Sequence, residues 1–402
     1  MSWSADHLSD NIIRMAAKQS ETNRVLAIGM VDSVHFARWL SSAQGVNAKF
    51  TIFPSGPNRR VHPTILGLTA KSSTNFSLSG FLAVLSLPIW ILDLMFFGRV
   101  RAIFLFYLLR LKHYDVVHFH EMQAGGYPLT HLPTGSLSKS RVFYTPYGSD
   151  LFWFQKDPKH LPRIRATLRL TDGIFPECER DGGLARNHGF QGELFSVMPA
   201  SGTFQFDGLV AVPVSNRSKI TVKGYGGTWG MAVEVLLALE KVQDRLLDYE
   251  IHLTSVTKDV AIEIARLQSE STLNLVLHPK FSLTTEEIKT LLSQSRYYIS
   301  LSKSDGFPAS LYEALACGAI PIQSDTACLP DSLVNIFPAS FVSTEDWPLL
   351  GGLLMQLDSD PKKLQILSKE FSKWAKKQEI KPELFRTIIS KAYELPSIVG
   401  SK

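Results

Sequence analysis

Short apolar runs recur along the first half of the chain, separated by polar turns and by stretches with helical periodicity. The runs lie at residues 25–30, 46–53, 115–120, 141–144, 173–176 and 194–198. Their length favours buried strands over core helices. Because helical stretches such as 36–43 alternate with these strands, the pattern predicts a parallel α/β domain.

The same alternation starts again after a polar stretch at 213–218. Further strands are expected at 219–223, 249–254, 273–277, 297–301 and 319–323, with a helix at 231–243. The repeated pattern predicts a second α/β domain that follows the first in the chain.

The predicted organisation has five parts. They are a polar N-terminal extension at 1–24, an N-terminal Rossmann-like domain at 25–205, a linker at 206–218, a C-terminal Rossmann-like domain at 219–380 and a helical segment at 381–402. The last helix is amphipathic and can pack on either domain, including back on the N-terminal one.

Composition excludes several classes of protein. The 402 residues are 45% hydrophobic and 20% charged, which is typical of a globular protein with a large core. The net charge of +5 is too weak to indicate nucleic acid, and it suits anionic small molecules or an anionic membrane surface. The three cysteines lack C-x-x-C spacing, so we predict neither a disulfide framework nor a zinc site, and a reducing compartment. Residues 1–24 have no apolar core typical of a secretory signal.

One apolar stretch, 76–97, carries a single charge, Asp93, and a basic, apolar segment follows it up to residue 112. Its 22 residues are long enough to span a bilayer, but Pro88 and Asp93 argue against that. An interfacial stretch with nearby cations and a buried pair of helices are the other two interpretations. The cations are Arg99, Arg101, Arg110 and Lys112.

The sequence SKSDGFPASLYEALACGAIPI, at 302–322, places two carboxylates around one turn and one helix. Asp305 stands in the turn after a predicted strand, and Glu313 stands in the helix that follows. Ligands of open α/β sheets bind at such strand ends, where helix N-termini offer free N–H groups. A carboxylate there can accept hydrogen bonds from sugar hydroxyls, although an acid that complements the helix dipole and a solvated Glu explain the pair equally well.

This string resembles the signature of the retaining family-four glycosyltransferases, which have the two-domain GT-B fold. The shared pattern is an acid, seven residues, a Glu, a helix of small residues and then G-x-x-P-I. The resemblance implies that Asp305 contacts the donor sugar, with the backbone amides of Gly306 and Phe307 beside Pro308. It also implies that Glu313 binds the nucleotide ribose. The first acid is usually Glu, and the shorter Asp305 leaves the identity of the sugar open.

Two segments of the N-terminal domain resemble the family as well. DVVHFHE, at 115–121, ends a predicted strand, and the resemblance implies that His120 touches the donor sugar and phosphate. A lone histidine at a strand end is more often structural. TPYGSD, at 145–150, is similar to a family loop that lines the crevice, with Gly148 and Asp150 as its candidates.

A glycine-rich loop, GYGGTWG, lies at 224–230 between a predicted strand and a predicted helix. This order suits a phosphate cradle made by the amides of Gly226 and Gly227, although residue 229 is Trp where the dinucleotide fingerprint needs Gly. The Arg and Lys that the family places here for the donor diphosphate are absent. We expect Lys303 in the donor loop to substitute, slightly ahead of Lys223, which can point away from the cleft because it lies inside a strand.

Residues 25–70 resemble the family least, because MVDSVHFARWL, at 30–40, replaces its glycine-rich acceptor loop. His35 and Arg38 are candidates for an acceptor contact, and an exposed helix face explains them equally well.

The resemblance implies a hexosyltransferase-type enzyme that moves a sugar, with retention, from a UDP- or GDP-linked donor to a carbohydrate or lipid-linked hydroxyl. Cell-surface polysaccharide or glycolipid synthesis is the expected setting, in the cytoplasm with a peripheral membrane contact through 76–112. Neither a metal nor another cofactor is expected, since no D-x-D cluster ends a strand. Two alternatives stay open: a non-catalytic nucleotide-sugar-binding or scaffold protein of this fold, and a GT-B-type nucleotide-sugar epimerase.

Overall fold

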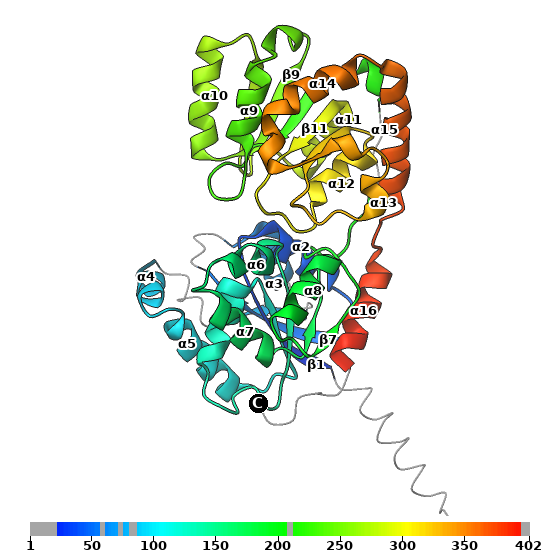
Figure 1. The fold of residues 1–402 in the computed structure, drawn as a ribbon. Helices are drawn as coiled ribbons and strands as arrows, with labels where there is room; N and C mark the ends of the chain where they lie inside the picture. The colour runs from blue at the N-terminus through cyan, green and yellow to red at the C-terminus, as the bar shows by residue number, and fades with distance from the viewer. Residues whose placement is uncertain (1–21, 57–60, 71–74, 80–86, 207–211, 395–402) are drawn as a thin grey trace, which may run out of the picture.

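The computed structural model describes residues 22–56, 61–70, 75–79, 87–206 and 212–394. Most of the expected extension at 1–24 lies outside these described residues, as do 207–211 of the linker, 80–86 of the apolar stretch and 395–402 at the C-terminus. The described chain folds into two α/β domains, which lie one above the other in Figure 1.

The N-terminal domain has a seven-stranded parallel sheet of order β3-β2-β1-β4-β5-β6-β7. The strands are β1 (Asn23–Gly29), β2 (Ala48–Pro54), β3 (Phe76–Leu78), β4 (Val116–His120), β5 (Arg141–Thr145), β6 (Gly173–Ile174) and β7 (Glu193–Leu194). Alternate residues of β1 enter two separate hydrophobic clusters, Val25 and Ala27 on one face and Leu26 and Ile28 on the other. The sheet is therefore covered on both faces, as a parallel sheet requires.

The C-terminal domain has a six-stranded parallel sheet of order β10-β9-β8-β11-β12-β13. The strands are β8 (Lys219–Lys223), β9 (Glu250–Val256), β10 (Asn274–Pro279), β11 (Ser295–Ser300), β12 (Ile320–Ser324) and β13 (Phe341–Val342). In both sheets the strand order reverses beside a central strand, and such switch points are where open α/β sheets bind ligands. The prediction of two parallel α/β domains is confirmed.

Helices surround both sheets. Those of the N-terminal domain are α2 (Val34–Ser42), α3 (Pro63–Ala70), α4 (Leu87–Met95), α5 (Arg99–Leu111), α6 (Ser149–Phe152), α7 (Leu161–Leu170) and α8 (Glu179–Asn187). Those of the second half of the chain are α9 (Ala232–Glu240), α10 (Lys258–Glu270), α11 (Thr285–Gln294), α12 (Ala309–Ala316), α13 (Asp331–Val334), α14 (Leu350–Asp358), α15 (Pro361–Lys376) and α16 (Pro382–Glu394).

The last helix, α16, returns to the N-terminal domain and runs down its side in Figure 1. Phe385, Ile389 and Tyr393 belong to the hydrophobic cluster that also contains residues of β1 and α2. The Tyr393 hydroxyl lies 2.8 Å from Nδ1 of His118 on β4. The end of the chain thus ties the two domains together by packing on the domain in which the chain began.

The apolar stretch that we considered as a spanning segment is divided between β3, α4 and undescribed residues. Among the described residues, none of the helices combines the length and the apolar character needed to cross a membrane. Asp93, its only acid, points inward and pairs with Arg101 of α5 at 2.6 Å.

Candidate active site between the two domains

Loops that follow strands of the two sheets meet at the interface between the domains, which lie one above the other in Figure 1. Gly148, after β5, lies directly against Gly306, after β11, and a Cβ on Gly148 would stand 2.2 Å from the Gly306 nitrogen. Gly148 also has a φ of +55°, so side chains are disfavoured there on two grounds. Nearby, the Trp153 ring meets the Trp229 ring at a centroid distance of 5.0 Å. Gly148 therefore lines the crevice between the domains.

Asp305 and Lys223 form an ion pair on the C-terminal side of this interface. Lys223 Nζ lies 2.7 Å from Asp305 Oδ2, and the two side chains are 18% and 19% exposed, Asp305 and Lys223 respectively. Lys223 ends β8, which pairs with β11, and Asp305 follows β11, so neighbouring strand ends supply both groups. Burial opposes the charge of Lys223, but the Asp305 carboxylate more than offsets this and raises the lysine pKa above its usual value.

The expectation that Lys223 can point away from the cleft is therefore wrong. Lys223 is the last residue of β8. Its side chain therefore reaches past the end of the strand to the Asp305 carboxylate, in the loop that follows β11. The backbone N–H of Lys303 donates to the Trp229 carbonyl at 2.7 Å, which joins the donor loop to the glycine loop. The geometry ranks Lys223 ahead of Lys303 as the cation nearest Asp305.

The two backbone amides after Asp305 both face carboxylate groups. The Gly306 N–H donates to Asp305 Oδ1 at 3.1 Å, and the Phe307 N–H faces Glu177 Oε2 of the other domain at 3.5 Å. A Cβ on Gly306 would meet Glu177 Oε2 at 2.1 Å, so this approach needs glycine. Pro308 is buried at the start of α12. In this structure both amides thus face carboxyl groups of the chain itself, and the role of Gly306, Phe307 and Pro308 with the donor sugar stays a prediction.

Sequence reasoning missed the segment at 176–181, which carries Glu177 and Arg180. Arg180 donates to the carbonyls of Thr326 at 2.7 Å and of Asp305 at 2.9 Å, both in the C-terminal domain. Burial raises the pKa of Glu177 well above its usual range and that of Asp181 to about 7. The available signal was the position of these charged residues directly after the predicted strand at 173–176, which is a carboxyl-end position.

Cys178 of this segment is bridged to Cys328 in the C-terminal domain, with a Cα–Cα distance of 5.8 Å. The prediction that the cysteines are unpaired is wrong for these two, because a separation of 150 residues hides the pairing from any local spacing rule. Among the described residues, Cys178, Asp181 and Cys328 also bring potential metal ligands within 4.8 Å of one another. Since the two sulfur atoms are joined, this cluster is a cross-domain link.

The glycine-rich loop does not offer the free amides that we expected. The Gly226 N–H donates to Thr257 Oγ1 at 3.0 Å, and the Gly227 N–H donates to Asp259 Oδ2 at 2.8 Å. Both acceptors stand at the start of α10, which the sheet order places beside this loop. A carboxylate of the chain thus occupies the position that we assigned to a phosphate, so the predicted cradle is wrong for this structure.

His120 is fully enclosed and does not open onto the crevice, contrary to expectation. Its ring lies 4.5 Å from the Trp39 ring and 4.8 Å from the Phe36 ring, both on α2. Neither ring nitrogen has a hydrogen-bond partner among the described residues. Burial lowers the pKa of His120 well below its usual value, and the adjacent His118 adds to this. The bulky segment that replaces the family's glycine-rich loop supplies both covering side chains.

Asp150 is also buried, and it organises the crevice loop from beneath. Its Oδ2 accepts hydrogen bonds from the Tyr144 hydroxyl at 2.9 Å and from the N–H groups of Met122 and Tyr147, each at 3.0 Å. Burial raises its pKa to about 6, although these hydrogen bonds oppose the shift. The expectation that Asp150 lines the crevice is therefore wrong, because three donors hold the carboxylate inside the domain.

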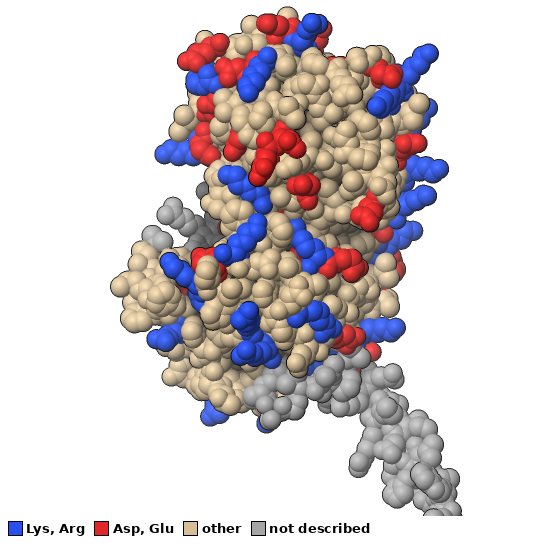
Figure 2. Space-filling view, viewed as in Figure 1, with Lys and Arg blue, Asp and Glu red and all other residues tan. Residues whose placement is uncertain are grey.

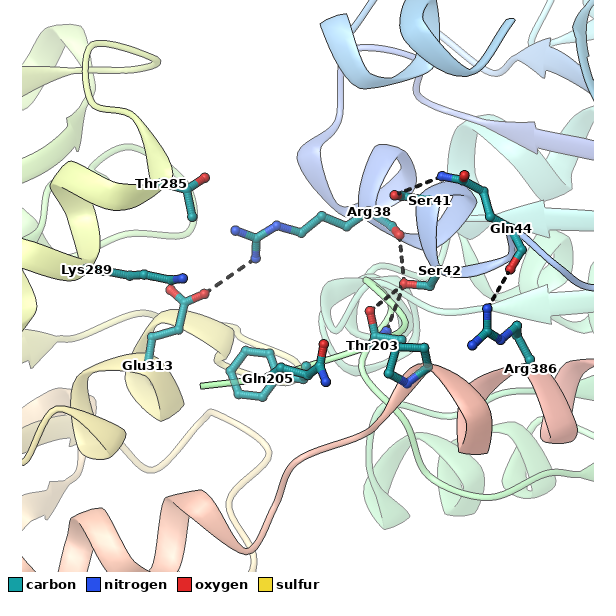
Figure 3. Close-up of a pocket in the computed structure, with 12 residues that line it drawn as sticks. Arg38, Ser41, Ser42, Gln44, Thr203, Gln205, Thr285, Lys289, Glu313 and Arg386 are labelled. Carbon is teal, nitrogen blue, oxygen red and sulfur yellow. Dashed lines mark hydrogen bonds and ion pairs between the residues drawn. The ribbon is translucent and has the colours of Figure 1, made fainter. Parts of the chain in front are cut away.

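Glu313 lines a cavity of about 500 Å³ between the domains, drawn in Figure 3. Arg38 reaches across from α2, and its Nη1 lies 3.5 Å from Glu313 Oε1. Lys289 and Arg386 add two more cations to the lining. Burial raises the pKa of Glu313, while Arg38 opposes the shift. Arg38 thus lies in the crevice, where its observed partner is the predicted ribose ligand.

His35 lies between these groups, on the α2 face that borders the crevice. Its ring is 5.8 Å from the Tyr147 ring and keeps an exposed edge. Although His35 is exposed, desolvation against the facing domain lowers its pKa, and the Arg38 cation lowers it further. A neutral imidazole at this place can accept a proton or a hydrogen bond from a group in the crevice.

Known proteins resemble this chain in part of its sequence and in its fold. Residues 257–378, which include Asp305 and Glu313, match the model of the family Glycosyl transferases group 1. ORF330 of Acidianus filamentous virus 2 (isolate Italy/Pozzuoli), a provisionally assigned glycosyltransferase, is 32% identical over 75 residues, which are 18% of this chain and 23% of the relative. The chain spans about a fifth of the length of the curated viral relatives it matches.

Two solved structures share the fold over nearly the whole chain. Anabaena HepE in complex with UDP-glucose superposes with a TM-score of 0.66 at 10% identity, over 93% of this chain and 100% of that one. A UDP-N-acetylglucosamine 2-epimerase superposes with a TM-score of 0.57 at 14% identity, over 92% and 95% of the two chains. The predicted GT-B fold is confirmed.

Proposed function

We propose that this chain, a GT-B protein whose C-terminal domain matches the glycosyl transferases group 1 model, transfers a sugar from a nucleotide-sugar donor to a hydroxyl group. The observation that carries the proposal is the Lys223–Asp305 pair, with Nζ and Oδ2 2.7 Å apart. A sugar bound to Asp305 would hold its diphosphate near the Lys223 ammonium. The fold shared with HepE, which was solved in complex with UDP-glucose, supports a UDP-linked donor among the UDP- and GDP-linked candidates.

The expected chemistry follows from these contacts. As the glycosidic bond breaks, negative charge grows on the departing diphosphate, and the fixed Lys223 cation stabilises it. Asp305 and the amide of Gly306 orient the sugar, so that positioning supplies much of the remaining rate. We propose retention of configuration, with the leaving phosphate taking the acceptor proton on the same face of the sugar. No protein nucleophile is required in that scheme.

The acceptor is proposed to be a carbohydrate or lipid-linked hydroxyl in polysaccharide or glycolipid synthesis at the inner face of the cell membrane. It would enter from the side of α2, where His35 keeps an exposed edge beside the crevice. A neutral histidine there suits a hydroxyl better than a second anion.

A thermal-shift screen with UDP-, GDP- and ADP-sugars tests the proposal, followed by turnover with a panel of acceptors. A ligand at a hundred times its Kd adds about 2.7 kcal/mol to the stability of the native state. We expect a shift with one nucleotide class in the parent and a reduced shift in Lys223→Ala. The proposal fails if no nucleotide sugar binds the parent.

A nucleotide-sugar epimerase is the second candidate, favoured by the buried carboxyl groups of Glu177 and Asp181. Burial raises the pKa of Asp181 to about 7, which suits a group that exchanges protons near neutrality. Incubation with the donor alone, without acceptor, distinguishes the two activities, since only the epimerase releases an epimerised nucleotide sugar. Donor binding without either reaction would favour a non-catalytic binding protein.

A further inference from the structure

Helices α4 and α5 expose apolar side chains and bury polar ones, which is the reverse of an ordinary surface helix. On α4, Ile91, Leu94 and Met95 are 51%, 57% and 67% exposed, while Asp93 is 1% exposed. The turn that follows adds Phe97, at 69% exposed. A large apolar surface of this kind marks an interaction site in a soluble domain.

The buried Asp93 carboxylate is held by hydrogen bonds within the domain. Asp93 Oδ1 accepts the backbone N–H of Arg101 at 2.9 Å, and its Oδ2 accepts the Arg101 side chain. The Arg101 guanidinium also donates to the carbonyls of Ser55 and Ala124 and stacks over the Trp90 ring. This network fixes the rotation of both helices, so their apolar sides must face outward.

The turn between the helices is fixed as well. Gly98 has a φ of +90°, and the Phe97 carbonyl accepts hydrogen bonds from Arg163 Nη2 and His131 Nε2, each at 3.1 Å. The two helices therefore form a rigid hairpin on the domain, with its apolar face already formed.

Cations border the apolar face on α5. Arg99, Ile103, Tyr107 and Leu111 recur at every fourth position and form one exposed stripe, and Arg110 and Lys112 lie exposed at its end. Asp93 is the only acid in the sequence from 87 to 112, and it is buried. In Figure 2, the surface at the left of the lower domain, where α4 lies in Figure 1, is a bulge without charged side chains.

We propose that this outer face of α4 and α5, the "hairpin face", docks the protein on a lipid bilayer that contains anionic headgroups. Aliphatic and aromatic side chains enter the boundary between headgroups and acyl chains, and the bordering cations contact the lipid phosphates. Between residues 87 and 112, this face has an apolar centre, bordering cations and no exposed acid. This distribution of charge matches the surface of an anionic membrane. This docking does not depend on the proposed transferase activity, but it would bring a lipid-linked acceptor to the enzyme.

Co-sedimentation of the full chain with vesicles tests the proposal without any activity assay. Vesicles of phosphatidylcholine alone are compared with vesicles that contain phosphatidylglycerol, at low and high salt. We expect binding to the anionic vesicles at low salt and release at high salt, because salt screens the cation–phosphate attraction.

Two double variants are compared, one on the hairpin face and one elsewhere, at side chains of similar exposure. Leu94→Glu/Met95→Glu alters the hairpin face, and Ile366→Glu/Ile262→Glu alters helical positions of the C-terminal domain that are 58% and 65% exposed. The first pair should weaken partitioning by about tenfold or more, and the second should leave it unchanged. Arg110→Glu/Lys112→Glu, which leaves the apolar residues intact, should reduce binding to anionic vesicles only.

Three results would overturn the proposal. They are an absence of binding to anionic vesicles at low salt, equal binding by both glutamate pairs, and a parent that dimerises through this face in size-exclusion chromatography without binding vesicles. The last result would identify a second copy of the chain as the occupant.

Discussion

The two faces of the domain interface occupy equivalent places, at the carboxyl ends of parallel strands, but they differ in charge. On the C-terminal face, Lys223 and Asp305 form an ion pair and keep nearly a fifth of each side chain exposed. On the N-terminal face, Glu177 is buried, and burial raises its pKa well above the usual range, which favours the neutral carboxyl group at pH 7.

This difference assigns the two faces to different parts of a substrate. A nucleotide diphosphate is an anion, and its charge is best stabilised by a fixed cation in a partly enclosed site, as Lys223 provides beside Asp305. The N-terminal domain brings Arg38 and Arg180 to the interface, but both are engaged with groups of the C-terminal domain, and its buried carboxyl groups do not repel an uncharged sugar or hydroxyl. Substitutions on each face test the assignment.

Lys223→Ala removes the cation of the charged face and should have the largest effect. Losing one contact to the developing charge of a transition state costs about 2.7–4 kcal/mol, so we expect turnover to fall by about a hundredfold or more. Steady-state kinetics with the nucleotide sugar found in the binding screen measure this loss. Lys303→Ala is the matched control in the adjacent loop, and we expect it to retain most of the turnover. Equal losses in the two variants would contradict the ranking of Lys223.

The Cys178–Cys328 bridge connects the two faces, so its removal tests whether they act as one unit. A cross-link that closes a long loop stabilises the folded state by about 2–4 kcal/mol. We expect Cys178→Ala to lower the free energy of unfolding by this amount under non-reducing conditions, and to match the parent once reductant is added. Cys317, the buried free cysteine, provides the control through Cys317→Ala. A deficit of Cys178→Ala that persists in reductant would exclude the bridge as its cause.

The Glu313→Ala variant removes a carboxylate of the C-terminal domain that is already paired with Arg38 of the N-terminal domain. If Glu313 binds the ribose, its loss removes charge-assisted hydrogen bonds worth about 1.5–3 kcal/mol, so donor affinity by calorimetry should fall about ten- to a hundredfold. Arg38→Ala removes the same cross-domain ion pair, a half-exposed contact worth about 0–1 kcal/mol, and leaves Glu313 in place. Equal losses in both variants would mean that Glu313 acts by holding the domains together.

Most of the fold could be predicted from the sequence, because the strands of parallel sheets are continuous apolar runs. The predicted strand at 219–223 coincides with β8, and the one at 319–323 differs from β12 by one residue at each end. The strands that escaped prediction, β3 and β13, have three and two residues and lie at sheet edges. β3 lies inside the apolar stretch at 76–97, where no turn marks the strand off from the residues that follow it.

The candidate site was less predictable, because most of its contacts join residues far apart in the chain. The motif at 305–313 is local and was visible. By contrast, Glu177 reaches the Phe307 amide across 130 residues, and Asp259 occupies the Gly227 amide across 32. Such partners depend on the packing of separate strand ends, which sequence spacing does not report.

His120 tests the N-terminal domain, where the smallest change in stability is expected. Both of its ring nitrogens are buried without a hydrogen-bond partner among the described residues, and an unsatisfied buried polar group costs about 1–3 kcal/mol. Its aromatic neighbours Phe36 and Trp39 would accept a phenyl ring in the same place. We therefore expect His120→Phe to raise the free energy of unfolding by about 1–2 kcal/mol.

The pH dependence of stability separates this effect from simple repacking. The folded-state pKa of His120 lies well below the usual 6.5, so the unfolded chain binds a proton that the folded chain excludes. Stability should consequently fall as the pH drops below 6.5, by up to about 1.4 kcal/mol per pH unit, and His120→Phe should remove that contribution. Urea unfolding at pH 5 and pH 7 measures both variants. Because His120 is enclosed and does not open onto the crevice, turnover should stay near the parental value while stability rises. A variant that is less stable than the parent would contradict the unsatisfied-histidine interpretation, and a large loss of turnover would return His120 to the site.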